Sequence, residues 1–181
     1  MLALPSAPTA GLGTGPGTEG PRLNPGAIEI GLAGALVSVE GGTRATIGVR
    51  GGRFLAAGSG LAGLEAELGY SHQQALDGVD LEGSLSWQRA ARARAIHPFA
   101  AIGGGLRAEK LGSFSQARYP VGFALGMRAL IDHHVALRIE YRYRRVLNDP
   151  VANFSEHQAL TGISLLLHNS ERPERGEEKR P

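Results

Sequence analysis

Apolar and polar residues alternate with a period of two along much of the chain. The clearest runs are 64–71, 79–88, 121–131 and 135–144. In these runs Leu, Val, Ile, Tyr or Trp occupies nearly every second position, and Gly, Ala, Ser or a charged residue occupies the positions between. A strand directs such residues to opposite faces, whereas a helix would scatter them around its axis. The pattern therefore predicts four strands.

The same alternation, less regular, extends to 27–39, 43–54, 97–107 and 157–167. Two apolar residues, Leu130 and Leu166, fall on the polar side of their runs. Gly51-Gly52 predicts a β-bulge in the second of the eight predicted strands. We find no segment with helical periodicity.

The connections between the predicted strands are short and rich in turn-forming residues. Gly41-Gly42, Gly58-Ser59-Gly60 and Asp132-His133-His134 are examples. Short connections join antiparallel neighbours, and eight strands are enough to close a barrel and remove both sheet edges. We therefore predict an all-β fold, an eight-stranded antiparallel up-and-down β-barrel.

Three regions differ in composition. Residues 1–26 are rich in Pro and Gly and are predicted to be a flexible leader, 27–168 form the barrel domain, and 169–181 are a charged, disordered tail. Within the barrel domain we expect outward-facing loops at 72–78, 108–118 and 147–157.

Alternation alone fits both a soluble and a transmembrane barrel. The direction in which the apolar face points distinguishes these two classes. A soluble barrel points its apolar residues inward, whereas a transmembrane barrel points them to lipid. The polar side of the predicted strands carries small residues mixed with Arg, Glu and Asp, and it carries no Lys. This composition suits a narrow lumen. The apolar side is nearly free of charge over about ten residues, the length that a tilted strand needs to cross a bilayer. These features favour the transmembrane type.

Aromatic residues near the strand ends favour the same class. If the strands alternate in direction, all the tyrosines fall at one rim and the single tryptophan at the other, as the two aromatic girdles of a membrane barrel would. The residues that we assign to the lipid interface are Tyr70, Trp87, Tyr119, Tyr141 and Tyr143.

Three segments, Gly63–His72, Tyr119–Val146 and Gly162–Leu167, carry a resemblance to a known family. They resemble the small outer-membrane β-barrel domain family, which includes OmpA-like transmembrane, OmpX-like and opacity-type eight-stranded barrels. The shared pattern is a Gly-rich strand, a tight turn, and a strand that ends in alternating Arg and Tyr. The resemblance implies a transmembrane barrel in the outer membrane of a Gram-negative-type bacterium, and no common enzymatic activity.

The composition of the 181 residues excludes several kinds of functional site. There is no cysteine, which excludes disulfides, thiolate nucleophiles and zinc–thiolate sites. The net charge is only +2, from 19 basic and 17 acidic residues, so we expect no nucleic-acid partner. We expect no cofactor, no metal site and no catalytic residues.

Charged residues on the polar faces are the main candidate site. Acidic residues gather on the third and fourth predicted strands and basic residues on the sixth and seventh, so they would meet across the lumen as an ion-pair network. Such a network plugs the lumen, and a narrow porin is the alternative. The predicted network consists of Glu65, Glu67, Asp80, Glu82, Arg128, Arg138, Glu140, Arg142 and Arg144. The alternation predicts that Glu29, Arg44 and Arg50 also face inward.

The sequence thus predicts a non-enzymatic, monomeric outer-membrane barrel with a structural or surface-interaction role. Its partners would be outer-membrane lipid and any extracellular ligand that the loops bind. Two alternatives stay open: a soluble periplasmic barrel that binds a small apolar ligand, and an outer-membrane lipid hydrolase using the cluster at His168, Ser170 and Glu171.

Overall fold

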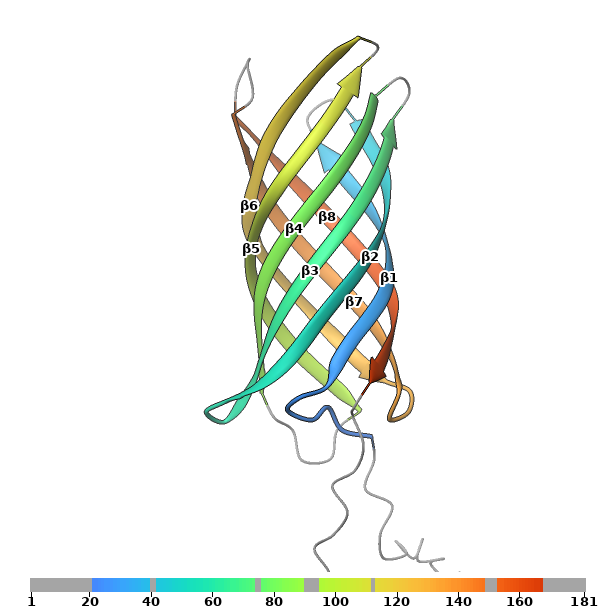
Figure 1. Ribbon diagram of the computed structural model, residues 1–181, viewed down its shortest axis with the longest axis vertical. Helices are drawn as coiled ribbons and strands as arrows, with labels where there is room; N and C mark the ends of the chain where they lie inside the picture. Colours follow the sequence, from blue (N-terminus) through green and yellow to red (C-terminus); the bar gives the residue numbers. More distant parts are fainter. Residues whose placement is uncertain are drawn as a thin grey trace, which may run out of the picture.

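Eight antiparallel strands form a closed barrel in which each strand pairs with its neighbours in sequence and β8 pairs with β1 (Figure 1). This computed structural model describes residues 21–39, 42–73, 76–89, 95–111, 113–148 and 153–167. The strands are β1 (Ile28–Val39), β2 (Gly42–Ala57), β3 (Gly60–Gln73), β4 (Leu76–Arg89), β5 (Ile96–Leu111), β6 (Phe114–Leu130), β7 (Val135–Leu147) and β8 (Phe154–Leu167). The predicted eight-stranded up-and-down barrel is confirmed.

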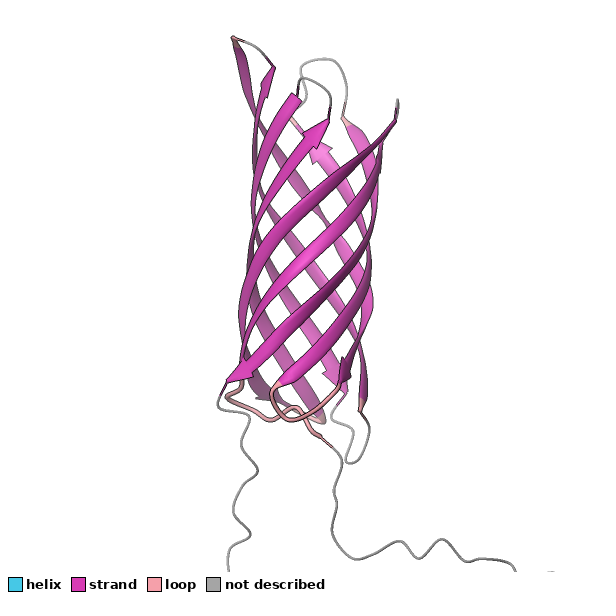
Figure 2. Cartoon of the chain, turned by 90° about the vertical axis from the view of Figure 1, so that its right-hand side faces the viewer, coloured by secondary structure: helices cyan, strands magenta, loops and turns pink. Residues whose placement is uncertain are grey.

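The barrel is tall and its strands are strongly tilted (Figure 2). An even number of strands brings the start of β1 and the end of β8 to the same end, which we call the lower end (Figure 1). In the described ranges no helix is long and apolar enough to cross a membrane. Residues 1–20 of the predicted leader and the predicted tail, 169–181, lie outside the described residues.

Several strands are longer than predicted, and they replace most of the expected loops. β3 and β4 remain paired up to Gln73 and Leu76, and β5 and β6 up to Leu111 and Phe114. The expected loops at 72–78 and 108–118 are therefore wrong, and the loop expected at 147–157 is confined to the residues between β7 and β8. Above the apolar band the outer face of these strands carries small or polar residues such as Ala108, Lys110 and Ser115, so alternation of hydrophobicity no longer marks them.

The bulge expected at Gly51-Gly52 is also wrong. Both glycines continue the register, Gly51 opposite Ile30 and Gly52 opposite Glu29. A Cβ on Gly52 would lie 2.9 Å from Cγ of Glu65, on the neighbouring strand. The glycine therefore leaves space for an inward carboxylate side chain instead of bending the strand.

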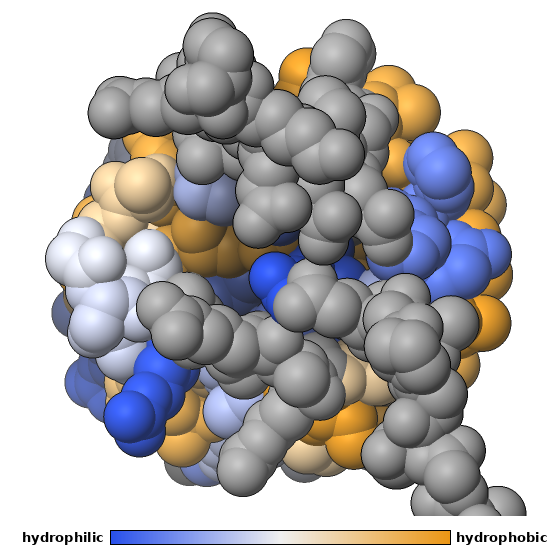
Figure 3. Space-filling view, turned by 90° about the horizontal axis from the view of Figure 1, so that it is seen from below, coloured by the Kyte–Doolittle hydropathy of each residue, from blue (hydrophilic) through white to orange (hydrophobic). Residues whose placement is uncertain are grey.

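The apolar residues of the alternating runs face outward. Leu68, Leu85, Leu125 and Ile139 are between 50% and 58% exposed. Seen from the lower end, hydrophobic residues lie at several places along the periphery of the barrel, with hydrophilic residues between them (Figure 3). These four side chains therefore do not line an interior cavity, as they would in a soluble barrel that binds an apolar ligand.

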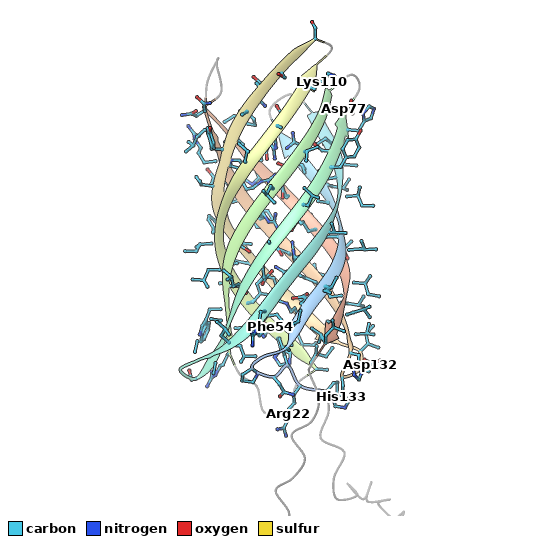
Figure 4. The ribbon with its side chains drawn as sticks, in the orientation of Figure 1. Arg22, Phe54, Asp77, Lys110, Asp132 and His133 are labelled. Carbon is cyan, nitrogen blue, oxygen red and sulfur yellow. The ribbon has the colours of Figure 1, made fainter. Side chains whose placement is uncertain are left out.

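The two residues that break the alternation close the lower end of the lumen. Leu130 and Leu166 point inward and pack in one buried cluster with Leu23, Phe54 and Leu61. Phe54 lies near the lower end (Figure 4). We call this cluster, completed by Ala27 and Ala136, the apolar floor. The floor explains why an apolar residue occupies a lumen-facing position at the ends of β6 and β8.

The segment before β1 contributes to the floor through its backbone as well as through Leu23. The Gly26 N–H donates to Phe54 O at 2.7 Å, and the Phe54 N–H donates to Ala27 O at 2.9 Å. Gly26 has φ of 91°, which glycine adopts without steric cost. Residues at the end of the predicted leader therefore lie against the mouth of the barrel.

The turn between β6 and β7 is held by Asp132. Its carboxylate accepts hydrogen bonds from the N–H groups of His134 at 2.6 Å and Val135 at 2.7 Å. The hydrogen bond from the His134 N–H, and to a smaller extent the one from the Val135 N–H, favours the charged form of the carboxylate. The two bonds hold the pKa of Asp132 below its usual range. This local bonding fixes the tight turn that the sequence Asp132-His133-His134 predicts.

Glycines opposite aromatic rings provide space inside the barrel. Phe99 pairs with Gly126 across β5 and β6, and Phe54 pairs with Gly63 across β2 and β3. A Cβ on Gly126 would lie 2.6 Å from Phe99 Cζ. Each ring therefore lies over a glycine, where a larger residue would collide with it.

Gly126→Val is expected to destabilise the folded barrel by about 1–3 kcal/mol, because the added side chain overlaps the Phe99 ring. Gly83→Ala is the matched control, since a Cβ there meets no atom within 4 Å. Urea titration of the barrel refolded in lipid vesicles measures both variants. Equal midpoints for the two would contradict the steric account.

Candidate functional site in the barrel lumen

All nine residues of the predicted network point into the lumen, and further charged residues join them. Within the described residues the inward set holds eight arginines and eight carboxylates, so its formal charges cancel. Each arginine lies within 4.0 Å of at least one carboxylate oxygen. The arginines are Arg44, Arg50, Arg107, Arg118, Arg128, Arg138, Arg142 and Arg144, and the carboxylates are Glu29, Glu65, Glu67, Asp80, Glu82, Glu109, Glu140 and Glu156.

Arg128 on β6 organises the layer directly above the apolar floor. Its Nη2 donates to Glu65 Oε1 at 2.6 Å, its Nη1 to Gln88 Oε1 at 2.8 Å, and its Nε to Glu29 Oε2 at 3.2 Å. Arg138 on β7 donates to the other oxygen of Glu65, also at 2.6 Å. One carboxylate on β3 therefore bridges two strands of the opposite wall.

Aromatic rings connect this layer to the apolar floor. Cζ of Arg128 lies 4.4 Å from the Phe99 ring centroid and 4.9 Å from that of Phe54. Cζ of Arg138 lies 4.3 Å from the Phe99 centroid. Cation–π attraction at these distances stabilises buried guanidinium groups that have left water. The passage from apolar floor to ionic lumen thus contains no uncompensated charge.

Arg142 and the three carboxylates that surround it fill the middle of the lumen. Its Nη1 donates to Glu82 Oε2 at 2.7 Å, its Nη2 to Glu67 Oε2 at 3.1 Å, and its Nε to Glu140 Oε1 at 2.8 Å. Arg50 on β2 also pairs with Glu67, and its Nη1 lies 3.3 Å from Glu140 Oε2. The predicted acidic strands and the predicted basic strands therefore meet here across the lumen.

Glu156 on β8 is the centre of the upper layer. It accepts hydrogen bonds from Arg44 at 2.8 Å, from Arg107 at 2.6 and 3.0 Å, and from Arg144 at 2.9 Å. Arg107 also donates to Asp80 at 2.5 Å. Four strands, β2, β4, β5 and β7, are thereby tied to β8.

Four members of this upper layer are not predicted from the sequence: Arg107, Glu109, Arg118 and Glu156. They lie at the edge of or within the segments expected to be loops at 108–118 and 147–157. A signal was available, because Arg107 and Glu109 continue the inward phase of Gly103 and Gly105, and Glu156 continues that of Gln158. Above the apolar band, the alternation of inward and outward positions identifies the strands, and hydrophobicity does not.

Little space remains between these side chains. One cavity of about 30 Å³ lies beside Glu82, Glu140 and Arg142, against the glycine-rich wall of β5 and β6. A second, of about 10 Å³, lies on the other side of Arg50 and Glu140. Since one water needs roughly 10–15 Å³ measured in this way, the first cavity has room for two or three waters and the second for at most one, and neither forms a continuous column.

The aromatic residues assigned to the lipid interface occupy the outer wall as follows. Tyr70, Tyr119 and Tyr141 are 46% to 48% exposed in the upper part of the barrel, with Tyr143 two residues beyond Tyr141 on β7. Trp87 is 48% exposed near the lower end of β4. The tyrosines and the tryptophan thus lie toward opposite rims.

The histidines are spread over the molecule. His97 is buried in the lumen, and His72 and His157 face outward on different strands. In the described ranges no three His, Asp or Glu side chains are placed to hold a metal ion. His168, Ser170 and Glu171, the cluster of the hydrolase alternative, lie outside the described residues.

Arg128→Met is expected to lower the free energy of unfolding by about 3–5 kcal/mol, because it leaves Glu29 and Glu65 buried with fewer partners. Arg53→Met is the control, since Arg53 is exposed on the outer face of β2. Denaturant midpoints of the two variants in the same lipid give the comparison. A shift of the same size for Arg53→Met would argue against the ion-pair explanation.

No family model and no curated protein matches the sequence. Solved structures do. The chain is similar to the N-terminal β-barrel domain of Pseudomonas aeruginosa OprF, with 13% identity and a TM-score of 0.60, over 79% of this chain and 98% of that one. It is also similar to Neisserial surface protein A, with 14% identity and a TM-score of 0.55, over 77% of this chain and 95% of that one.

A third similar structure is the outer membrane enzyme PagL, with 11% identity and a TM-score of 0.53, over 75% of this chain and 97% of that one. At such identities the likeness establishes the fold and not the activity. The chain has the fold of the small eight-stranded outer-membrane β-barrels, a closed transmembrane-type barrel whose apolar side chains face outward.

Proposed function

We propose that this protein is a non-enzymatic barrel of the bacterial outer membrane with a structural or surface-interaction role and a closed lumen. The observation that carries the proposal is the inverted distribution of side chains. Large apolar residues are exposed on the outer wall while sixteen paired charges lie inside. Water would not favour such an exterior, whereas lipid solvates it at no cost.

The aromatic residues support a definite position in the membrane. We assign Tyr70, Tyr119, Tyr141 and Tyr143 to one membrane–water interface and Trp87 to the other. Rings with a polar group prefer this depth, where the ring contacts lipid and the hydroxyl or N–H contacts water. The apolar band between them, including Leu125 and Ile139, would then lie in the hydrocarbon.

The paired charges and the apolar floor support a plugged lumen over a narrow porin. A conducting path would need a continuous water column, and the two small cavities do not provide one. Ions would also have to cross the apolar floor that Phe54, Leu130 and Leu166 form, where burial out of water is costly for a charge.

A lipid hydrolase receives no support from the described outer wall. Ser155 and His157 share one face of β8, but Ser155 Oγ bonds Tyr143 Oη at 2.9 Å and His157 Nδ1 bonds Tyr141 Oη at 2.6 Å. Nucleophilic catalysis requires the nucleophile to be bonded to its base. The short hairpins at the upper end likewise leave little loop surface, which favours a structural role over ligand recognition by loops.

Ile139→Arg is expected to destabilise the barrel in lipid by about 2–4 kcal/mol, because it places a charge near the middle of the hydrocarbon, whereas Ala117→Arg should cost at most about 1 kcal/mol. Ala117 is also exposed and faces outward, but lies two residues beyond Tyr119 toward the hairpin. Folding free energies in vesicles test this, and equal effects would contradict a lipid-facing outer wall.

Membrane residence itself is tested by expressing the chain behind a secretory signal. We expect it to co-fractionate with outer membranes and to migrate faster on gels before boiling than after, as compact barrels do. Recovery in the soluble periplasmic fraction would contradict the proposal.

The plug is tested separately in planar bilayers. We expect no large, steady single-channel steps from the refolded chain, because the paired charges and the apolar floor block ions. Reproducible steps that depend on the added protein would instead establish the narrow porin.

A further inference from the structure

Arg145 is an arginine on the outer wall, unlike the eight that face the lumen. It is exposed on β7, between Val121 of β6 and Ser155 of β8. Its Nη1 lies 3.3 Å from Ser155 Oγ, and among the described residues it makes no ion pair with a carboxylate. Most of the donors of this guanidinium group therefore remain available to an anion from outside the chain.

Polar and aromatic side chains extend from Arg145 down the same face. Ser155 Oγ is 2.9 Å from Tyr143 Oη, and the Tyr143 ring lies 5.4 Å from His157 between centroids. Tyr141 Oη is hydrogen-bonded to His157 Nδ1 at 2.6 Å. We call these five residues the Arg145 cluster. Their mutual contacts hold the hydroxyl groups and the guanidinium group on one side of β7 and β8.

Arg145 lies at the height expected for the membrane–water interface. A strand that rises about 3.4 Å per residue at a tilt near 40° places Arg145 about 26 Å above Val135, while the apolar band of such barrels is about 25 Å tall. Below the cluster the outer wall is apolar, with Leu125 and Ile139 exposed. The cluster thus lies where lipid headgroups meet acyl chains.

We propose that the Arg145 cluster binds the phosphate of an anionic lipid, in the leaflet at the upper end of the barrel; this rests on the proposed membrane location. The Arg145 guanidinium pairs with phosphate oxygens, for which its planar fork of donors is suited. Ser155 and Tyr143 share one hydrogen bond, and the hydroxyl hydrogen that this bond leaves over donates to the same headgroup. The acyl chains lie along Leu125 and Ile139, which is why a lipid fits better than a free anion.

The test measures lipid retained by the full chain, folded in bilayers of equal parts phosphatidylglycerol and phosphatidylcholine with identical acyl chains. Native mass spectrometry after detergent extraction gives the ratio of the two bound lipids. We expect phosphatidylglycerol to be enriched, and Arg145→Gln to reduce the enrichment about fivefold, as loss of one interfacial arginine predicts. Tyr143→Phe should reduce it less, because it removes one hydroxyl and leaves the cation.

Arg53→Gln is the matched control, because Arg53 is also exposed on the outer wall but lies toward the lower end of β2. Unchanged enrichment in this variant supports the proposal, and an equal loss would show a non-specific effect of charge and overturn it. Complete displacement of phosphatidylglycerol by excess inorganic phosphate would assign the cluster to a soluble anion instead. A chain that fails to fold in any bilayer overturns the membrane proposal too, whereas a folded chain without enrichment overturns this inference alone.

Discussion

The pairing of arginine with carboxylate inside a narrow barrel is the interaction on which the rest of the structure depends. The lumen of an eight-stranded barrel has room for side chains and little else. A buried charge there is stable only with partners, and truncating one partner leaves the other exposed to a large desolvation cost. The described lumen meets this condition by an equal number of arginines and carboxylates, each in contact with the opposite charge.

Arginine is the suitable cation because one guanidinium reaches several strands. Arg128 on β6 contacts residues of β1, β3 and β4, and Glu156 on β8 collects arginines from β2, β5 and β7. Backbone hydrogen bonds connect only adjacent strands, whereas these contacts cross the lumen. The network therefore braces opposite walls of a molecule whose large apolar residues do not form a central core.

The limited volume of the lumen determines which residue types fill the remaining inward positions. Eight arginines occupy much of the lumen, and glycines such as Gly52 and Gly126 leave room for the larger side chains of Glu65 and Phe99. The lower end is different, since Leu130, Leu166 and Phe54 form an apolar floor beneath the ionic layers. Inward glycines such as Gly52 and Gly126 and the two interruptions of the alternating pattern thus have one common cause, the filling of a closed barrel.

The sequence by itself determined the strand number, the antiparallel order and the two faces, because these follow from a local period of two and from short turns. It also identified Glu65, Arg128 and Arg142 as inward charges by their phase. Only the tertiary structure decided which carboxylate meets which arginine, since pairing across the lumen depends on strand tilt and stagger, which alternation does not encode. The upward extension of β5 and β6 has no signal in hydrophobicity, because Arg107 and Glu109 lie beyond the apolar band, and the sequence indicates it only through the inward phase of these two residues.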